Sequence, residues 1–188
     1  MKKVFLLTTA FFYACSNPIE IVKHPLDKSQ KKIITLDNGL KIHLLSDPSF
    51  NVSAASMSVM VGNLEDPKNR QGLAHFLEHM LFLGTKKYPS VDEYKSYLQT
   101  NGGYSNAYTA RDHTNYHFQV LPDALEGALD RFAQFFISPL FTEQYTEREV
   151  NAVNSEFQNY LMNDMWRSFQ ISNLFAKESH PAQNFNVG

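Results

Sequence analysis

Residues 72–84 read Gly-Leu-Ala-His-Phe-Leu-Glu-His-Met-Leu-Phe-Leu-Gly, and this stretch carries the strongest structural signal of the chain. Its apolar residues recur with helical periodicity, so we predict a helix that ends at Gly84. On a helix, His75 and His79 lie four residues apart on one face, with their Cβ atoms roughly 5–6 Å apart. Two imidazoles at this spacing can bind one zinc ion, whose bonds to histidine nitrogen are about 2.0–2.1 Å long.

Glu78 shares this edge of the helix, because it lies three residues after His75. From there it can accept a proton from a water on the metal without being a ligand, and it can pass that proton to a leaving amine. The alternative is a core helix that carries two histidines by chance. However, burying three unpaired polar groups would cost on the order of several kcal/mol. The His-x-x-Glu-His pattern is that of the inverted zinc peptidases, with Glu78 as the general base.

Strand and helix patterns alternate along the rest of the chain. An Asn-Gly pair between two alternating runs predicts a β-hairpin over residues 32–45. Two spacings are those of capping boxes at helix starts, Ser90 with Glu93 and Thr146 with Glu149. The other predicted elements are strands over residues 52–61, 104–111 and 114–121, and helices over 90–103, 122–137, 146–162 and 166–177. Together they predict an α+β domain, a mostly antiparallel sheet with helices packed on it.

Composition excludes several classes of protein. The chain has 188 residues, 43% hydrophobic and 13% aromatic, which suits one domain with a real core rather than a disordered chain. With 17 basic against 19 acidic residues, no basic surplus indicates nucleic acid as a partner. The single cysteine, Cys15, excludes a disulfide framework and a thiolate metal site.

Residues 1–16 have the pattern of an export signal. Two lysines precede a largely apolar run from Val4 to Ala14, which is too short to span a bilayer comfortably. Cys15 follows directly, as in a bacterial lipoprotein cleavage site. We therefore expect an exported protein, periplasmic in a bacterium or tethered to a membrane through a lipidated Cys15. Ordinary cleavage and a buried N-terminal segment are the alternatives. Residues 17–30 are polar and aperiodic and are predicted to be a linker.

The flanks of the histidine motif resemble the insulin-degrading enzyme and pitrilysin family of inverzincin zinc metallopeptidases. The likeness is carried by residues 72–89, 103–107, 113–116, 125–136, 148–156 and 163–167. It thus covers roughly residues 30 to 188. The resemblance implies a metallopeptidase fold of the LuxS and processing-peptidase type, one Zn²⁺ per chain, and peptides or small proteins as substrates.

The resemblance also implies roles for residues distant from the motif. A third zinc ligand falls on Glu156, and a glutamate at the position of Glu149 orients a ligand histidine. Asn106 and Ala107 match the edge strand on which the family lays its peptide substrate, where backbone groups bind an extended chain. The alternatives are a solvated helix face for either glutamate and an ordinary paired strand for Asn106 and Ala107.

Length leaves two hypotheses open. Family members consist of four related domains in two halves that close over the peptide, and residues 31–188 match most of the first domain. The resemblance therefore implies an N-terminal catalytic domain truncated at its C-terminus. One hypothesis is a zinc-dependent metalloendopeptidase, acting alone or with a separate C-terminal half or homologous subunit. The other is a noncatalytic remnant or subunit. The intact Glu78 favours the first and the short chain the second.

Overall fold

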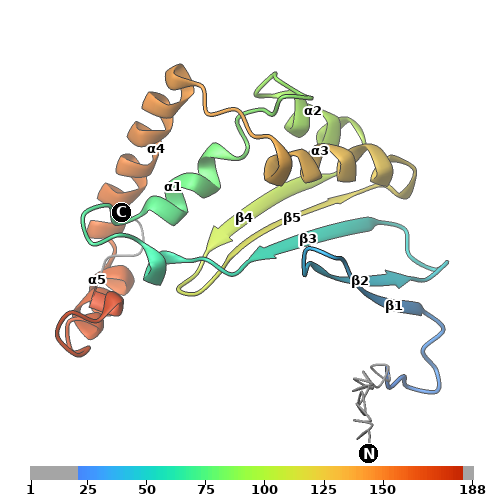
Figure 1. The fold of residues 1–188 in the computed structure, drawn as a ribbon, viewed down its shortest axis with the longest axis horizontal. Helices are drawn as coiled ribbons and strands as arrows, with labels where there is room; N and C mark the ends of the chain where they lie inside the picture. Colours follow the sequence, from blue (N-terminus) through green and yellow to red (C-terminus); the bar gives the residue numbers. More distant parts are fainter. Residues whose placement is uncertain (1–20, 184–188) are drawn as a thin grey trace, which may run out of the picture. The chain divides into compact units, whose positions relative to one another are not determined.

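A computed structural model describes residues 21–183, which form two compact units, one ending at Phe50 and one beginning at Asn51 (Figure 1). The expected export signal, with Cys15, lies outside the described residues. Within residues 21–183, no helix is both long enough and apolar enough to cross a membrane.

The first unit contains the predicted hairpin. Strands β1 (Gln30–Thr35) and β2 (Lys41–Ser46) pair antiparallel along their whole length. In the turn between them, Gly39 has φ +85°, a left-handed conformation that glycine adopts at little cost. This conformation explains why an Asn-Gly pair is a good signal for the turn, and the hairpin prediction is confirmed.

The second unit is built on a three-stranded antiparallel sheet. Its strands are β3 (Ser53–Val59), β4 (Tyr104–Thr109) and β5 (Thr114–Val120), in the order β3-β5-β4. The central strand, β5, alternates strictly between buried and half-buried residues, because one face of the sheet meets the core. Among the described residues β4 pairs with β5 alone, so its other side is a free sheet edge.

Three helices cover one face of this sheet: α1 (Leu73–Met80), α2 (Glu93–Thr100) and α3 (Leu125–Ile137) (Figure 1). Aromatic rings fill the space between them, with Phe118 of β5 packed edge-to-face on Phe132 of α3 at 5.2 Å. The buried core comprises Leu81, Tyr94, Leu98, Tyr116, Phe118, Val120, Ala124, Ala128, Phe132 and Phe135. The α+β architecture is the predicted one.

Two further helices complete the unit, α4 (Glu143–Leu161) and α5 (Asp164–Asn173). The long α4 packs against both α1 and α5, which places it beside the histidine-bearing helix (Figure 1). Single 3₁₀ turns occupy Asn63–Glu65, Pro122–Ala124 and Pro181–Gln183.

The two predicted capping boxes are wrong. Helix α2 begins at Glu93 without a side-chain cap, and the Glu93 carboxylate bonds instead to Arg131 of α3, with Oε1 2.8 Å from Nε. Helix α4 begins three residues earlier than predicted, so Thr146 lies inside its first turn and donates to the Thr142 carbonyl at 3.1 Å. Glu93 has its partner on another helix, and Thr146 has its partner at the start of its own helix. The spacing of the residues reveals neither contact.

Candidate metal centre

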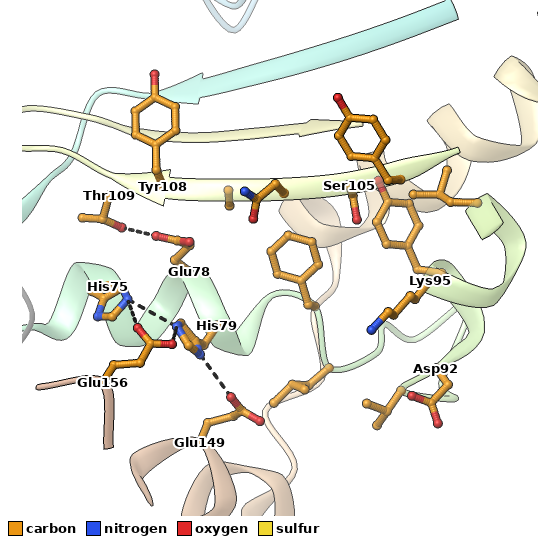
Figure 2. Close-up of a pocket in the computed structure, with 18 of the residues that line it drawn as sticks. His75, Glu78, His79, Asp92, Lys95, Ser105, Tyr108, Thr109, Glu149 and Glu156 are labelled. Carbon is orange, nitrogen blue, oxygen red and sulfur yellow. Dashed lines mark hydrogen bonds and ion pairs between the residues drawn. The ribbon is translucent and has the colours of Figure 1, made fainter. Parts of the chain in front are cut away.

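The two histidines of the motif face each other on α1, as their spacing predicts. Their Nε2 atoms are 3.3 Å apart, and the rings meet edge-to-face with centroids 4.8 Å apart (Figure 2). The start of α1 is held by Asp66, whose carboxylate accepts hydrogen bonds from the amides of Gly72 at 2.7 Å and Ala74 at 2.9 Å. This cap comes from the preceding loop and fixes the position from which both imidazoles project.

Glu156 reaches the two histidines from α4. Its Oε2 lies 3.5 Å from Nε2 of His75, and its Oε1 lies 3.7 Å from Nε2 of His79. Within residues 21–183 these three residues form the one group of three metal-ligating side chains whose ligand atoms all lie within 4.8 Å of one another. A tetrahedral zinc ion with bonds of about 2.0–2.1 Å separates its ligand atoms by about 3.3–3.4 Å. The three side chains therefore fit a zinc ion with little adjustment.

Glu149 is not one of the three candidate ligands but contacts one of them, His79. Its Oε2 is 3.2 Å from Nδ1 of His79, on the side of the ring away from Glu156 (Figure 2). If Nδ1 carries the proton and donates it to Glu149, Nε2 keeps its lone pair and turns it toward His75. Two nitrogens and a carboxylate converge at that point, a donor set that suits a cation.

The carboxylate of Glu78 lies between α1 and β4 and is nearly buried, with 9% of the residue exposed. Its Oε2 accepts a hydrogen bond of 2.6 Å from the hydroxyl of Thr109 on β4 (Figure 2). Sequence reasoning missed Thr109. The alternation of β4 places this residue on the helix-facing side of the sheet, but only the fold shows that it lies above Glu78.

Asn106 and Ala107 both lie on β4, the edge strand of the sheet. Ala107 packs against the core, whereas Asn106 is exposed and pairs with His117 across the sheet. Successive side chains of a strand point to opposite faces, so a peptide along this edge meets the backbone of both residues but not both side chains. The structure places these residues at a free edge beside the cavity.

A cavity of about 810 Å³ opens next to the three candidate ligands, within the usual size range for ligand sites. Side chains of α1, α2, β4 and α4 line it. Lys95 projects its amine into the cavity from α2 (Figure 2). Arg148 of α4 also lines the cavity, and its Nη2 lies 3.2 Å from Oε1 of Glu149.

The phenol of Tyr160 borders the same cavity. Burial raises its pKa above the usual range, and the charges of Glu156 and Glu78 add to this effect. The hydroxyl therefore stays protonated and neutral at physiological pH. It adds no negative charge to a site where the carboxylates of Glu149 and Glu156 already contact the two imidazoles.

Helix α1 carries the His-x-x-Glu-His pattern, and α4 adds the carboxylate of Glu156 beside a cavity. This arrangement is typical of metallopeptidases of the inverted zinc type. Comparison with known proteins agrees. The model of the insulinase family, peptidase family M16, matches residues 41–179, and the chain belongs to that family.

Individual relatives confirm the predicted resemblance. The chain is 51% identical over 168 residues to the insulin-degrading enzyme of Homo sapiens, covering 89% of this chain and 16% of the human one. It is 54% identical over 168 residues to that of Drosophila melanogaster, covering 89% and 17%. The crystal structure of pitrilysin superposes with a TM-score of 0.84 at 43% identity, covering 89% of this chain and 18% of pitrilysin. The chain thus spans about a sixth of the length of these proteins.

Proposed function

We propose that this chain supplies the zinc-binding catalytic part of an endopeptidase that hydrolyses peptides. The observation that carries the proposal is the convergence of His75, His79 and Glu156 at zinc-like separations, with Glu78 beside them. A zinc ion held there would supply a Lewis acid for the substrate carbonyl and would lower the pKa of a bound water to about 7. The part of the chain that the structure describes has one such group of candidate ligands, which supports the proposal of one zinc per chain.

Glu78 is the residue that we propose moves the proton. Thr109 holds Oε2, while Oε1 has no hydrogen-bond partner among the described residues. Oε1 can therefore take a proton from the attacking water as the water oxygen bonds to the peptide carbonyl carbon. When the carbon–nitrogen bond breaks, the same carboxyl gives that proton to the leaving amine, so the reaction ends in a free acid and a free amine.

The free edge of β4 is the surface that we propose holds the substrate. An extended peptide can add to this edge through main-chain hydrogen bonds, with the backbone of Asn106 and Ala107 as partners. Such binding makes few demands on side chains. The relatives named insulin-degrading enzyme act, by their name, on insulin. Peptides and small proteins are accordingly the substrate class that we propose for this chain.

A second candidate function is a noncatalytic subunit that keeps the metal site. It stays an alternative because the chain spans about a sixth of the length of the relatives, so the activity of those whole proteins is a proposal for this chain. A related version is a catalytic part that needs a separate half or a homologous subunit to hold the peptide.

Peptide hydrolysis by the zinc-loaded chain, with a matched Glu78→Gln variant, separates these candidates. The amide keeps the shape of the side chain but cannot accept the proton. We expect slow cleavage of fluorogenic peptides that a chelator abolishes and that Glu78→Gln loses while it retains zinc. Equal cleavage by both proteins would exclude Glu78 as the base. The absence of cleavage with full zinc binding would favour the noncatalytic subunit.

A further inference from the structure

We propose that Thr109 is a positioning residue, whose hydroxyl fixes the carboxylate of Glu78 in the orientation needed for proton transfer. The inference rests on the proposed function, since it assigns a role to Thr109 only through Glu78. Its starting point is the hydrogen bond of 2.6 Å from Thr109 Oγ1 to Glu78 Oε2. This length is typical of the strong bonds that a hydroxyl makes to a charged carboxylate.

The hydrogen bond leaves the two oxygens of Glu78 with different roles. Oε2 is held against β4, and Oε1 has no partner among the described residues, so it remains available to a water or an amine in the cavity. A glutamate side chain has three rotatable bonds, and ordering it costs conformational entropy. A bond that fixes one oxygen therefore also fixes the direction of the other.

The neighbouring hydroxyl explains why the Thr109 proton goes to Glu78. Thr114 is the cross-strand partner of Thr109, and its Oγ1 lies 3.5 Å away. However, the Thr114 hydroxyl donates its own single proton to the carbonyl of Val61 at 2.8 Å. It cannot donate to Thr109 as well. The Thr109 proton then has a neutral acceptor at 3.5 Å and a carboxylate at 2.6 Å, and the carboxylate is the better acceptor.

The backbone around Thr109 is held from outside its strand. Directly after β4, the carbonyls of Ala110 and Arg111 accept hydrogen bonds from the amides of Asn63 at 3.1 Å and Leu64 at 2.9 Å. This approach is so close that a Cβ at Gly62 would lie 2.5 Å from both carbonyl oxygens. Thr109 is also β-branched, which restricts its χ1 rotamer. Both features keep the hydroxyl in place when Glu78 moves a proton.

Removing the hydroxyl should lower turnover without weakening the binding of zinc or peptide. Thr109→Val has nearly the same shape but no donor, so Glu78 would sample orientations in which Oε1 points away from the reacting atoms. A displacement of about 1 Å in a catalytic geometry can cost about 100-fold in rate. We expect kcat to fall by about that factor in Thr109→Val, with KM changed by less than about twofold, whereas Thr109→Ser keeps the hydroxyl and most of the activity.

The experiment compares the zinc-loaded chain with Thr109→Val, Thr109→Ser, Glu78→Gln and Thr35→Val, the last an exposed threonine of β1 as the matched control. Zinc content, melting temperature, kcat and KM are measured for each. A Thr109→Val protein with wild-type kcat, or a Thr109→Ser protein as slow as Thr109→Val, overturns the proposal while the proposed function stands. Full activity in Glu78→Gln overturns the proposed function itself, and the positioning role with it.

A crystal structure of zinc-loaded Thr109→Val decides the question even where turnover is too slow to measure. We expect the Glu78 carboxylate to leave its position beside β4 or to occupy several positions, while the three candidate ligands stay in place. A Glu78 side chain unmoved from its wild-type position would show that packing alone orients it, and the role assigned to Thr109 would be wrong.

Discussion

At the scale of single residues, the site depends on pairs in which one side chain prepares another. Glu149 binds the ring nitrogen of His79 that faces away from Glu156, and Thr109 binds one oxygen of Glu78. Each partner binds an atom of the catalytic or ligand side chain other than the atom proposed to contact the metal or the substrate. The chemistry of the site therefore involves residues that the His-x-x-Glu-His motif does not contain.

Glu149→Gln tests the first of these pairs. The neutral amide oxygen accepts a weaker hydrogen bond from the Nδ1 proton of His79 than a carboxylate does, so the tautomer is held less firmly and the ring loses some basicity. We expect zinc affinity to fall by about 10–100-fold, measured by competition with a chromophoric chelator. Glu147→Gln, on the exposed side of α4, is the matched control. Equal affinities in the two variants would contradict the role of Glu149.

The sequence predicts some of these residues and not others, for a physical reason. His75, Glu78 and His79 lie within one turn and a half of one helix, so helical geometry alone brings them together. Glu156 and Glu149 come from a helix about 70 residues later, and only the resemblance to a known family pointed to them. Nothing in the sequence pattern relates Thr109 to Glu78, because their contact depends on how α1 crosses the sheet.

At the scale of elements, α1 is held at its start by a group outside it, because Asp66 accepts hydrogen bonds from the first amides. The helix ends at Met80, before the predicted end at Gly84, and Gly84 lies in the following loop with φ +97°. A Cβ at Gly84 would lie 2.8 Å from the carbonyl oxygen of Pro89. Both features belong to the loops that flank α1, the helix that carries the two histidines.

Asp66→Ala removes the cap of α1. Two backbone amides lose a charged acceptor, so we expect the free energy of unfolding to fall by about 1–2 kcal/mol, the upper part of the range for helix caps. Urea denaturation of the apo chain gives this value directly. Asp37→Ala, an exposed aspartate of the hairpin turn, serves as the comparison. A loss no larger than in that control would mean that Asp66 does not stabilise the helix.

The elements themselves were more predictable than their ends. Strands and helices with strong periodicity appear where the sequence places them, because burial of one face produces that periodicity. Helix starts were misjudged where capping groups lie outside the local pattern. The Glu93 carboxylate illustrates this point, since it pairs with Arg131 on α3 rather than with its own helix.

At the scale of the whole molecule, side chains of α1, α2, β4 and α4 line the cavity beside the candidate ligands. Peptide hydrolysis requires a substrate held in line with the attacking water, and orientation contributes a large part of the rate. The longer relatives have structure beyond the matched part that this chain does not span. The proposed activity of the chain alone is therefore expected to be weak.

Turnover measured on a verified monomer tests this expectation. We expect kcat/KM for short fluorogenic peptides at least about 100-fold below the usual range of about 10⁴–10⁸ M⁻¹s⁻¹. Activity should rise if a separate half is supplied. A chelator-sensitive monomer that works within the usual range would show that the chain is a self-sufficient peptidase.

Export of the protein is a further proposal that concerns the whole molecule. We propose that the mature protein begins at or near Cys15 and resides outside the cytoplasm, with an acyl chain on Cys15 as the tether if it is lipidated. Intact mass measurement of the protein from its native host, with fractionation of cells that carry Cys15→Ser, tests this. Release from the membrane fraction is expected for the variant. Uncleaved chain recovered from the cytoplasm would contradict export.

The proposed zinc site can be tested directly by a crystal structure of the zinc-loaded chain with anomalous data at the zinc edge. We expect one peak per chain, bound by Nε2 of His75, Nε2 of His79 and a carboxylate oxygen of Glu156, with bonds of about 2.0–2.2 Å. His79→Ala should lose the peak. A zinc ion bound elsewhere, or a peak that persists when all three ligands are replaced, would contradict the assignment of this site.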